Sequence, residues 1–411
     1  MAPRAKKPSR AERTRQLEKR ASAVEVPSSA DVVICGGGAA GIVAAISAAE
    51  AGARVVVLER ALECGRTILA TGGGRCNFAN ARLDMAHYRN PEFVAAVAGP
   101  SFLDDVLGFF SNCGLGWAEE AEGRLYPITR ESSTVREVLL ARAARANVTL
   151  ACGREAKGIR RGGQSGQGLE VRYCDTFGGK EPRTMTANAV VLATGGGSAR
   201  TAESLGIPTV SEHAALCPLA CKGLDFARLD GRRAHATATL SRDGKTLAVE
   251  KGEVLFRPYG ISGIATFNLS RKAQAGDTIA LDFLPTLSLK QARALYARGK
   301  GAMGLLDDEL AHQLSRTGDV VAAAKSCRLL VLGTTDEGHA QVSAGGIATG
   351  ALDPSTLGAY GCPDLFVCGE AVDVDGDCGG FNLAWAWKSG MVAGSAAAKR
   401  CREKRKCRDQ R

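Results

Sequence analysis

The stretch from Asp31 to Arg60 constrains the fold of this chain more than any other. It reads DVVICGGGAAGIVAAISAAEAGARVVVLER, so a β-branched run is followed by glycines, small apolar residues and a second apolar run. This order predicts a buried strand, a tight turn, a helix and another buried strand. Such a βαβ unit indicates an α/β fold, in which helices cover a mainly parallel sheet.

The glycines of the turn fit the GxGxxG pattern. Gly36 allows the tight turn, Gly38 lets the backbone approach a pyrophosphate, and Gly41 lets the helix pack closely on the strand. A phosphate would lie at the helix N-terminus beside Ala39 and Ala40, where unpaired N–H groups favour an anion. The alternative is a glycine turn in an ordinary βαβ unit, and the strand before and helix after the turn favour the nucleotide site.

An acidic residue ends the second strand of this unit. Glu59 lies 18 residues after Gly41, where a carboxylate can accept both hydroxyl protons of a ribose and would repel a 2′-phosphate. Its neighbour Arg60 is included in the predicted cofactor-binding set. The unit therefore predicts a site for an adenine dinucleotide.

Length and cysteine usage set the broad class of protein. A chain of 411 residues is long enough for two or three domains. Its 14 cysteines include no CxxC pair, the start has no apolar signal segment, and no run has transmembrane length. We expect a cytoplasmic protein with free thiols, no contact with a membrane and no redox pair of adjacent cysteines.

The positive charge of the chain is concentrated at its two ends. Residues 1–30 have a net charge of +5 and residues 399–411 a net charge of +6, which leaves the rest at −1 within the total of +10. Such ends are typical of solvated, disordered tails. We do not expect the body of the protein to bind nucleic acid, and only these tails are candidates for such binding.

A second glycine-rich loop carries the resemblance to a known family. The segment ATGGGRCNFAN, residues 70–80, resembles the GGGRCNxTN segment of the YhiN/BaiN-like bacterial flavoproteins, often described as NAD(P)/FAD-dependent oxidoreductases and including aminoacetone oxidase-type enzymes. The resemblance spans roughly residues 30–397. It implies that Arg66 lies near the phosphates of FAD and that a run of residues follows the cofactor: Gly73, Gly74, Arg75, Cys76 and Asn77.

Two further segments match the family. Residues 122–127, EGRLYP, resemble its EGRxFP element, and here Arg124 and Tyr126 are the candidates for binding or protonating a substrate. The alternative is a surface loop anchored by Tyr126. Residues 189–197, AVVLATGGG, predict a buried strand that would bring Thr194 and Gly195 against the dinucleotide, while Ala156 would offer its backbone to the adenine.

The last family segment, residues 365–390, predicts a strand, an acidic turn and a helix that begins near Asn382. Glu370 would hold ribityl hydroxyls, and the helix N-terminus would point at N1 and O2 of the flavin, where negative charge develops on reduction. The acidic DVDGD run lacks the later glutamate of an EF-hand loop, which disfavours a calcium site. The predicted contacts of this segment are Gly369, Glu370, Asp373, Gly379, Gly380, Phe381, Asn382 and Leu383.

These patterns predict an α/β protein whose Rossmann-like FAD-binding domain, of the two-dinucleotide-fold type, contains an inserted β-rich domain. The expected boundaries are a disordered tail at 1–29, an FAD-binding domain at 30–200 and 335–398, a substrate domain at 201–334 with a helical segment at 288–326, and a tail at 399–411. The region from about 218 to 285 supports the β-rich insertion because it contains repeated short strands.

The predicted function is FAD-dependent transfer of a hydride or two electrons between NAD(P)H, or another donor, and a small organic substrate. FAD is expected to bind non-covalently, and the chain has no second GxGxxG directly after a predicted strand, so NAD(P)H would visit only transiently. Two alternatives remain, a flavin-dependent RNA-modifying enzyme and a flavin-binding protein without turnover. No metal site is expected, since the five histidines lack metal-ligand spacing: His87, His213, His235, His312 and His339.

Overall fold

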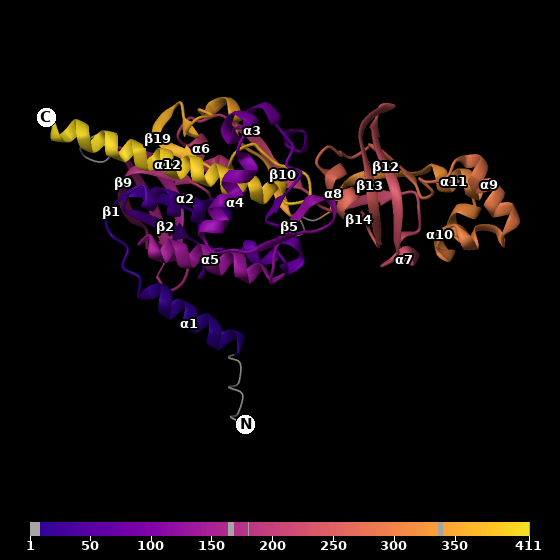
Figure 1. Cartoon of the computed structure of the whole chain (residues 1–411), viewed down its shortest axis with the longest axis horizontal. Helices are drawn as coiled ribbons and strands as arrows, with labels where there is room; N and C mark the ends of the chain where they lie inside the picture. The colour runs from indigo at the N-terminus through magenta and orange to yellow at the C-terminus, as the bar shows by residue number, and fades with distance from the viewer. Residues whose placement is uncertain (1–8, 163–167, 180, 336–339, 411) are drawn as a thin grey trace, which may run out of the picture. The chain divides into compact units, whose positions relative to one another are not determined.

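The computed structural model describes residues 9–162, 168–179, 181–335 and 340–410. The chain divides into two compact units (Figure 1). The first contains Met1–Glu212 and Gly345–Arg411, and the second contains His213–Ala344. The sequence places these boundaries at about 200 and 335, whereas in the structure both fall later in the chain.

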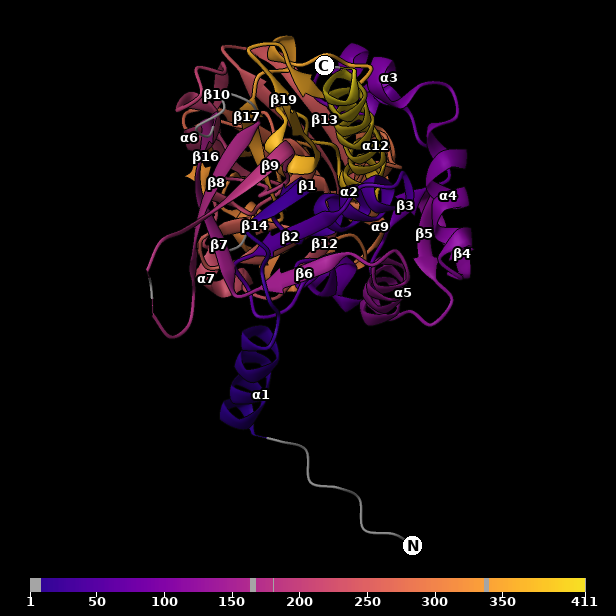
Figure 2. The ribbon, with the colours of Figure 1, turned by 90° about the vertical axis from the view of Figure 1, so that its left-hand side faces the viewer.

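The first unit is built on a mixed sheet whose strand order is β18-β19-β9-β1-β2-β6, with β7 and β8 joined to it through β9 (Figure 2). β1 pairs in parallel with both β2 and β9, so it lies inside the sheet. The strands are β1 Ser29–Cys35, β2 Val55–Glu59, β6 Thr149–Cys152, β7 Arg154–Arg161, β8 Leu169–Asp175, β9 Arg183–Leu192, β18 Gly358–Ala359 and β19 Cys362–Val367.

The apolar runs of the sequence form the interior of this sheet. Every residue of β1 after Ser29 is buried, as are the first four residues of β2. Strands covered by helices on both faces need apolar side chains on both faces, which explains the continuous runs. The helices and short 3₁₀ turns of this unit are α2 Ala39–Glu50, η1 Ile68–Gly74, η2 Met85–His87, α3 Pro91–Ala98, α4 Phe102–Asn112, η3 Ala121–Gly123, α5 Ser132–Arg145, α6 Ala199–Glu203, η6 Thr349–Ala351, η7 Gly369–Ala371 and α12 Phe381–Asp409.

The long helix α12 lies directly against α2. A Cβ atom on Gly390 would lie 2.6 Å from the Ala40 carbonyl oxygen, and one on Gly394 would lie 2.2 Å from the Ala44 carbonyl oxygen. The two helices therefore approach at a distance that only glycine permits at these positions. This contact holds the last helix of the chain on the first βαβ unit.

A small antiparallel sheet also belongs to this unit. Its strand order is β3-β5-β4, with β3 at Ala79–Asn80, β4 at Trp117–Glu119 and β5 at Arg124–Pro127. The pair β3 and β5 joins the end of the glycine-rich segment at residues 70–80, here called the RCN loop, to the EGRLYP segment, since Ala79 is opposite Leu125. These two family-like segments are therefore neighbours in space.

The predicted disordered tails each contain a helix in the part that the structure describes, which corrects the sequence interpretation. Helix α1, Arg10–Ser22, begins with a capping box between Ser9 and Glu12, and its Ala21 is buried. α12 continues to Asp409, and Cys401 within it is 1% exposed. Both ends fold because each buries an apolar side chain against the unit. Residues 1–8 and 411 lie outside the described part.

The second unit is a closed barrel with helices in the connections between its strands. Its strand order is β11-β14-β13-β12-β15-β16, and the neighbouring strands are antiparallel. The strands are β11 Leu219–Lys222, β12 Arg233–Arg242, β13 Lys245–Arg257, β14 Gly260–Ser262, β15 Thr278–Asp282 and β16 Cys327–Thr334. The helices are α7 Phe226–Leu229, α8 Ile264–Ser270, α9 Leu289–Arg298, η4 Gly301–Gly304, α10 Asp308–Ser315 and α11 Val320–Lys325.

Two strands span the unit boundaries, β10 at Thr209–Ala215 and β17 at Val342–Ile347, and they pair with each other. No single helix in the described ranges has the length and apolarity to cross a bilayer. The pair α3 and α4, bent by 51°, meets those criteria only when both helices are taken together.

Candidate cofactor site

The glycine turn after β1 has the geometry that the sequence predicts for it. Gly36 has a φ of +108°, and a Cβ on Gly41 would lie 1.9 Å from the Gly36 carbonyl oxygen. Gly38 is the N-cap of α2 and supplies no side chain to it, so Ala39 and Ala40 begin a helix whose N-terminus has no side-chain cap. This end of α2 can bind an anion through its backbone N–H groups.

Glu59 closes this turn from the neighbouring strand. Its Oε2 accepts a hydrogen bond of 2.6 Å from the Gly37 amide, and its Oε1 accepts one of 2.7 Å from the Ala61 amide. A carboxylate oxygen has room for a further donor, so both oxygens can also accept from ribose hydroxyls. Sequence reasoning missed Gly37, although the run of three glycines contained the signal.

The RCN loop offers open backbone next to a buried polar group. Gly73 and Gly74 are exposed, have φ of +64° and +87°, and a Cβ on either would meet no atom within 4 Å. Cys76 behind them is buried, and burial raises the pKa of its thiol to about 11. The Asn77 Oδ1 atom is buried and has no hydrogen-bond partner in the described structure.

The start of α12 lies against this loop. A Cβ on Gly380 would be 2.4 Å from the Ala79 carbonyl oxygen and 2.9 Å from Asn77 Oδ1. Asn80 Nδ2 donates a hydrogen bond of 2.9 Å to the Gly379 carbonyl oxygen. Two segments that are about three hundred residues apart in the sequence are thus in direct contact.

Two further segments meet the same turn. A Cβ on Gly369 would lie 2.6 Å from the Ala40 Cβ atom, and one on Gly36 would lie 3.0 Å from the Thr194 Cα atom. The Thr194 hydroxyl is 2.7 Å from that of Ser198, which donates to the Gly195 carbonyl oxygen at 2.6 Å. The structure therefore brings Glu59, Thr194 and Gly369 close to the glycine turn and the N-terminus of α2.

The acidic turn before α12 is tied to residues that the sequence did not single out. Arg89 Nε lies 2.5 Å from the Asp375 carboxylate, and Asn90 Nδ2 donates to the Asp373 carbonyl oxygen at 2.7 Å. Asp373 Oδ1 is buried without a hydrogen-bond partner in the described structure, although Arg89 Nε is 3.9 Å away. At the start of α12, Phe381 stacks on His87 with ring centroids 4.2 Å apart.

Asn382 has a structural role in the described part of the chain. Its amide accepts a hydrogen bond from the Gly376 N–H and donates one to the Gly376 carbonyl oxygen. Leu383 follows it and is partly buried, and Glu370 lies in η7. Three other predicted residues have less specific surroundings, because Arg60 and Arg66 are exposed at the surface and Ala156 lies within β7.

The substrate candidates lie on β5 beside the RCN loop. Tyr126 is 4% exposed, and the Arg75 guanidinium carbon lies 4.7 Å from the centre of its ring. Arg75 Nη1 is 3.6 Å from the Glu120 carboxylate, while Arg124 pairs with Glu122. Arg75 is therefore the exposed cation of this group, and Tyr126 supports it from beneath.

These residues fit FAD. The structure supplies an uncapped helix N-terminus for phosphates, Glu59 for a ribose and open glycine backbone. It also supplies two buried oxygen atoms, Asn77 Oδ1 and Asp373 Oδ1, that have no hydrogen-bond partner among the described residues. A buried polar atom without a partner costs free energy, so a ligand that donates to it would be stabilised there. Non-covalent attachment remains a prediction.

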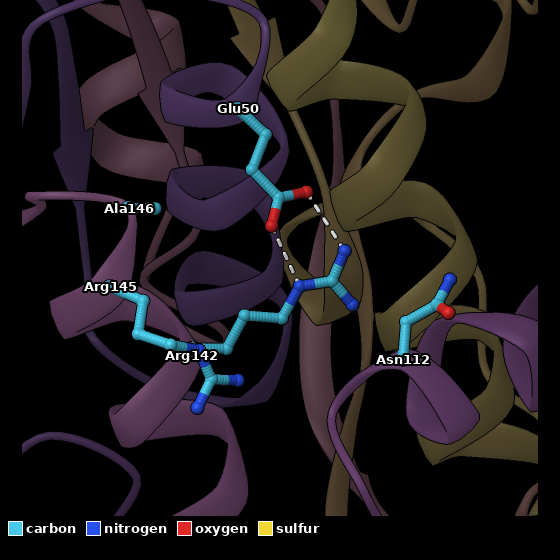
Figure 3. Close-up of a pocket in the computed structure, with 5 residues that line it drawn as sticks. All are labelled: Glu50, Asn112, Arg142, Arg145 and Ala146. Atoms are coloured by element: carbon cyan, nitrogen blue, oxygen red, sulfur yellow. Dashed lines mark hydrogen bonds and ion pairs between the residues drawn. The ribbon is translucent and has the colours of Figure 1, made fainter.

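A separate hollow on the surface of the first unit does not belong to this site. It is lined by Glu50, Asn112, Arg142, Arg145 and Ala146 (Figure 3). Arg142 Nε and Nη2 bind the two carboxylate oxygens of Glu50 at 2.7 and 2.8 Å. Arg142 also lies over the Phe109 ring and donates to the Phe109 carbonyl oxygen, so it already has its partners.

The described residues contain no group of three or more His, Cys, Asp or Glu side chains that could hold a metal ion. His339, one of the five histidines, lies outside the described residues.

Comparison with known proteins places the chain among flavoprotein-type oxidoreductases. A family model described as HI0933-like protein Rossmann domain matches residues 30–396. A 3-dehydro-bile acid delta(4,6)-reductase of Clostridium scindens is 32% identical over 414 residues, covering 89% of this chain and 98% of that protein. A ribosomal RNA dihydrouridine synthase of Escherichia coli is 26% identical, and the match covers 87% of this chain and 96% of that protein. The solved structure of a flavocytochrome c3 fumarate reductase shares the fold, with a TM-score of 0.51 and 16% identity. The match covers 94% of this chain and 81% of that one.

Proposed function

The chain belongs to the HI0933-like Rossmann family, and we propose that it binds FAD non-covalently and uses electrons from NAD(P)H to reduce a small conjugated carbonyl compound. Two contacts within one unit carry the proposal: the Gly36 turn and the start of α2 lie against Thr194 and Gly369, and residues 77–80 lie against the start of α12. The likeness to a protein named as a reductase over nearly its whole length supports the reductive direction.

The residues of the chain bind and orient the cofactor in this proposal. The N-terminus of α2 neutralises phosphate charge, and Glu59 accepts from the adenosine ribose while the Gly37 and Ala61 amides fix its carboxylate. The N-terminus of α12 favours negative charge beside it. FAD, when bound, supplies the two-electron chemistry. Arg75, held over Tyr126, would attract the oxygen of a carbonyl substrate.

The first test is the identity of the bound flavin. The purified full-length protein should be yellow, and acid precipitation should release FAD into the supernatant. Flavin that stays in the pellet would contradict non-covalent binding, and a preference for FMN would contradict the adenosine site at Glu59. A colourless protein that does not take up added FAD would reject the proposal.

The second test concerns the electron donor and acceptor. In anaerobic stopped-flow experiments the flavin absorbance should bleach with NADH or NADPH and recover on addition of an enone. If both nucleotides leave the flavin oxidised while an amine or alcohol bleaches it, the enzyme works as an oxidase. If no donor bleaches it, the flavin-binding protein without turnover becomes the better description.

A second candidate function is modification of RNA, which the basic helical ends favour. Arg10, Arg13 and Arg15 are exposed on α1, and the last two turns of α12 are also rich in Lys and Arg. Relatives named ribosomal RNA dihydrouridine synthases support this candidate. Phosphate contacts make affinity strongly dependent on salt. A salt-sensitive association with ribosomal RNA that is lost when these three arginines are replaced by glutamine would favour it, provided that flavin binding is unchanged.

A further inference from the structure

Two cysteine thiols touch each other beside the candidate nucleotide site. Cys64 Sγ and Cys152 Sγ are 3.5 Å apart, although the two residues are 88 positions apart in the sequence. Cys64 follows β2 and is 2% exposed, whereas Cys152 ends β6 and is only partly buried. Cys152 is also opposite Glu59 in the β2–β6 register. The absence of any CxxC spacing hides this pair from the sequence.

The backbone around both thiols is fixed by hydrogen bonds. The Gly153 amide donates to the Ala61 carbonyl oxygen at 2.8 Å, and Arg136 Nε donates to the Cys64 carbonyl oxygen at 2.8 Å. The two sulfur atoms are thus held near each other by several contacts. A disulfide needs an S–S distance of about 2.05 Å, so closure requires a movement of roughly 1.5 Å.

The two thiols differ in acidity and access. The hydrogen bond from the Cys64 thiol lowers the pKa of Cys152, and the Cys64 backbone and Arg136 lower it further. Burial acts against them by raising the pKa, but the net shift is downward. The same thiol–thiol hydrogen bond, together with burial, raises the pKa of Cys64. Cys152 is therefore the thiol that ionises first, and the thiolate is the nucleophilic form.

We infer that Cys64 and Cys152 are a site of reversible disulfide formation by hydrogen peroxide, and that the disulfide weakens binding of the dinucleotide. The Cys152 thiolate attacks one peroxide oxygen, so an S–O bond forms, the O–O bond breaks, and the leaving hydroxide takes a proton to become water. Cys64 then loses its proton and attacks the Cys152 sulfur. The S–S bond forms, the S–O bond breaks and a second water leaves. Two electrons pass from the thiols to the peroxide.

The coupling to the nucleotide site follows from the position of Cys64. A Cβ on Gly37 would lie 2.6 Å from Cys64 Sγ. Gly65, which follows Cys64 in the chain, donates its amide hydrogen to the Gly37 carbonyl oxygen at 2.7 Å. Drawing Cys64 toward Cys152 pulls on this contact, and Gly37 in turn holds the Glu59 carboxylate. The effect on affinity rests on the proposed flavin site, whereas the disulfide itself does not.

The disulfide can be tested on the full-length protein by peptide mapping. Trypsin separates the two thiols into peptides 61–66 and 146–154, each of which contains one cysteine. After reduction, desalting, brief treatment with hydrogen peroxide and alkylation, we expect the two peptides to be linked, and dithiothreitol to separate them. Oxidation of the exposed Cys407 while both peptides remain alkylated as free thiols would overturn the inference.

Variants test the order of the steps. Cys64→Ser should leave a sulfenic acid on Cys152 that dimedone traps, whereas Cys152→Ser should give no trapped product at Cys64. Cys407→Ser is the matched control and should form the linked peptide as the wild type does. Trapping at Cys64 in the Cys152→Ser protein would overturn the assignment of the attacking thiol. The wild-type mapping needs no substitution, so it stands even if a variant misfolds.

FAD titration of the reduced and oxidised wild-type protein tests the coupling. Loss of about one backbone hydrogen bond predicts a Kd about five- to tenfold higher in the oxidised form, restored by dithiothreitol. Equal Kd values for the two forms would overturn the coupling. If the reduced protein binds no FAD, the proposed function fails, while the mapped disulfide stands by itself.

Discussion

The Gly37 amide donates a hydrogen bond of 2.6 Å to the carboxylate of Glu59, and this bond joins the glycine turn to the end of the neighbouring strand. Because the Ala61 amide binds the other oxygen, the carboxylate is fixed from two sides before any ligand arrives. Such preorganisation lowers the entropy cost of binding a ribose. Glu59 thus combines a structural role with its predicted role in binding.

Replacing this carboxylate by an amide tests both roles. In Glu59→Gln one oxygen becomes an NH₂ group, which cannot accept from a backbone N–H or from a ribose hydroxyl. We expect FAD affinity to fall by about 1.5 to 3 kcal/mol, the range for a hydrogen bond to a charged group. Isothermal titration calorimetry with FAD measures this loss of affinity. Glu92→Gln on the exposed start of α3 is the control, and equal affinities for the two variants would contradict the prediction.

The packing of α12 on α2 gives a second prediction. An alanine in the middle of a helix is normally more stable than glycine by about 1 kcal/mol. At Gly394, however, the new Cβ would lie 2.2 Å from the Ala44 carbonyl oxygen, so the helices must move apart. We expect Gly394→Ala to destabilise the protein by about 1 to 3 kcal/mol, measured as a lower Tm.

Gly108→Ala is the matched control for this substitution. Gly108 lies within α4, and its added Cβ would meet no atom within 4 Å. The Tm of the Gly108→Ala protein should therefore be equal to or higher than that of the wild type. A Gly394→Ala protein that is as stable as Gly108→Ala would show that α12 does not pack closely on α2.

The sequence predicted the parts of the site that are local along the chain. Gly36, Gly41 and Glu59 lie within one βαβ unit, where spacing alone decides which groups meet. The contact between Asn77 and Gly380 was not predicted, because no periodicity relates residues so far apart, and the family resemblance implied only that both residues lie at the FAD site. Arg89 was missed for the same reason.

The helical ends were predicted wrongly because composition outweighed local signals. Ser9 and Glu12 form a capping box that the sequence itself displays, yet the density of Lys and Arg favoured a disordered tail. At the other end, burial of Cys401 stabilises α12, and that burial depends on the tertiary fold. A charged segment thus becomes ordered where a few of its residues have partners in the folded unit.

The stacking of Arg75 on Tyr126 predicts that the ring matters more than the hydroxyl. Tyr126→Phe keeps the ring beneath the guanidinium, whereas Tyr126→Leu removes it. A cation–π contact at a partly exposed site contributes about 0.5 to 1 kcal/mol, so the Leu variant should lose about two- to fivefold in kcat/KM for an enone. The Phe variant should match the wild type in steady-state assays. A loss of several hundredfold in Tyr126→Phe would instead identify the hydroxyl as a proton donor.

The buried carboxylate of Asp31 ties the C-terminal part of α12 to the sheet. Burial alone would raise the pKa of Asp31, but the Arg54 amide and the Arg405 guanidinium lower it by more, so the net shift is downward. A carboxyl with a lowered pKa in the folded state stabilises the protein above its unfolded pKa of about 3.9. That contribution is lost as the pH falls through the folded pKa.

Arg405→Ala should therefore destabilise the protein in a way that depends on pH. Because the Arg405 side chain is 44% exposed, solvent screens the pair, and we expect a loss of about 1 kcal/mol at neutral pH. The difference in Tm from the wild type should begin to shrink below about pH 4, near the unfolded pKa of Asp31, and should be lost as the pH falls through the lowered folded pKa. Lys406→Ala removes a neighbouring exposed charge and should show little difference at any pH. A Tm difference for Arg405→Ala that stays constant down to about pH 3 would mean that Arg405 acts through packing and not through the charge of Asp31.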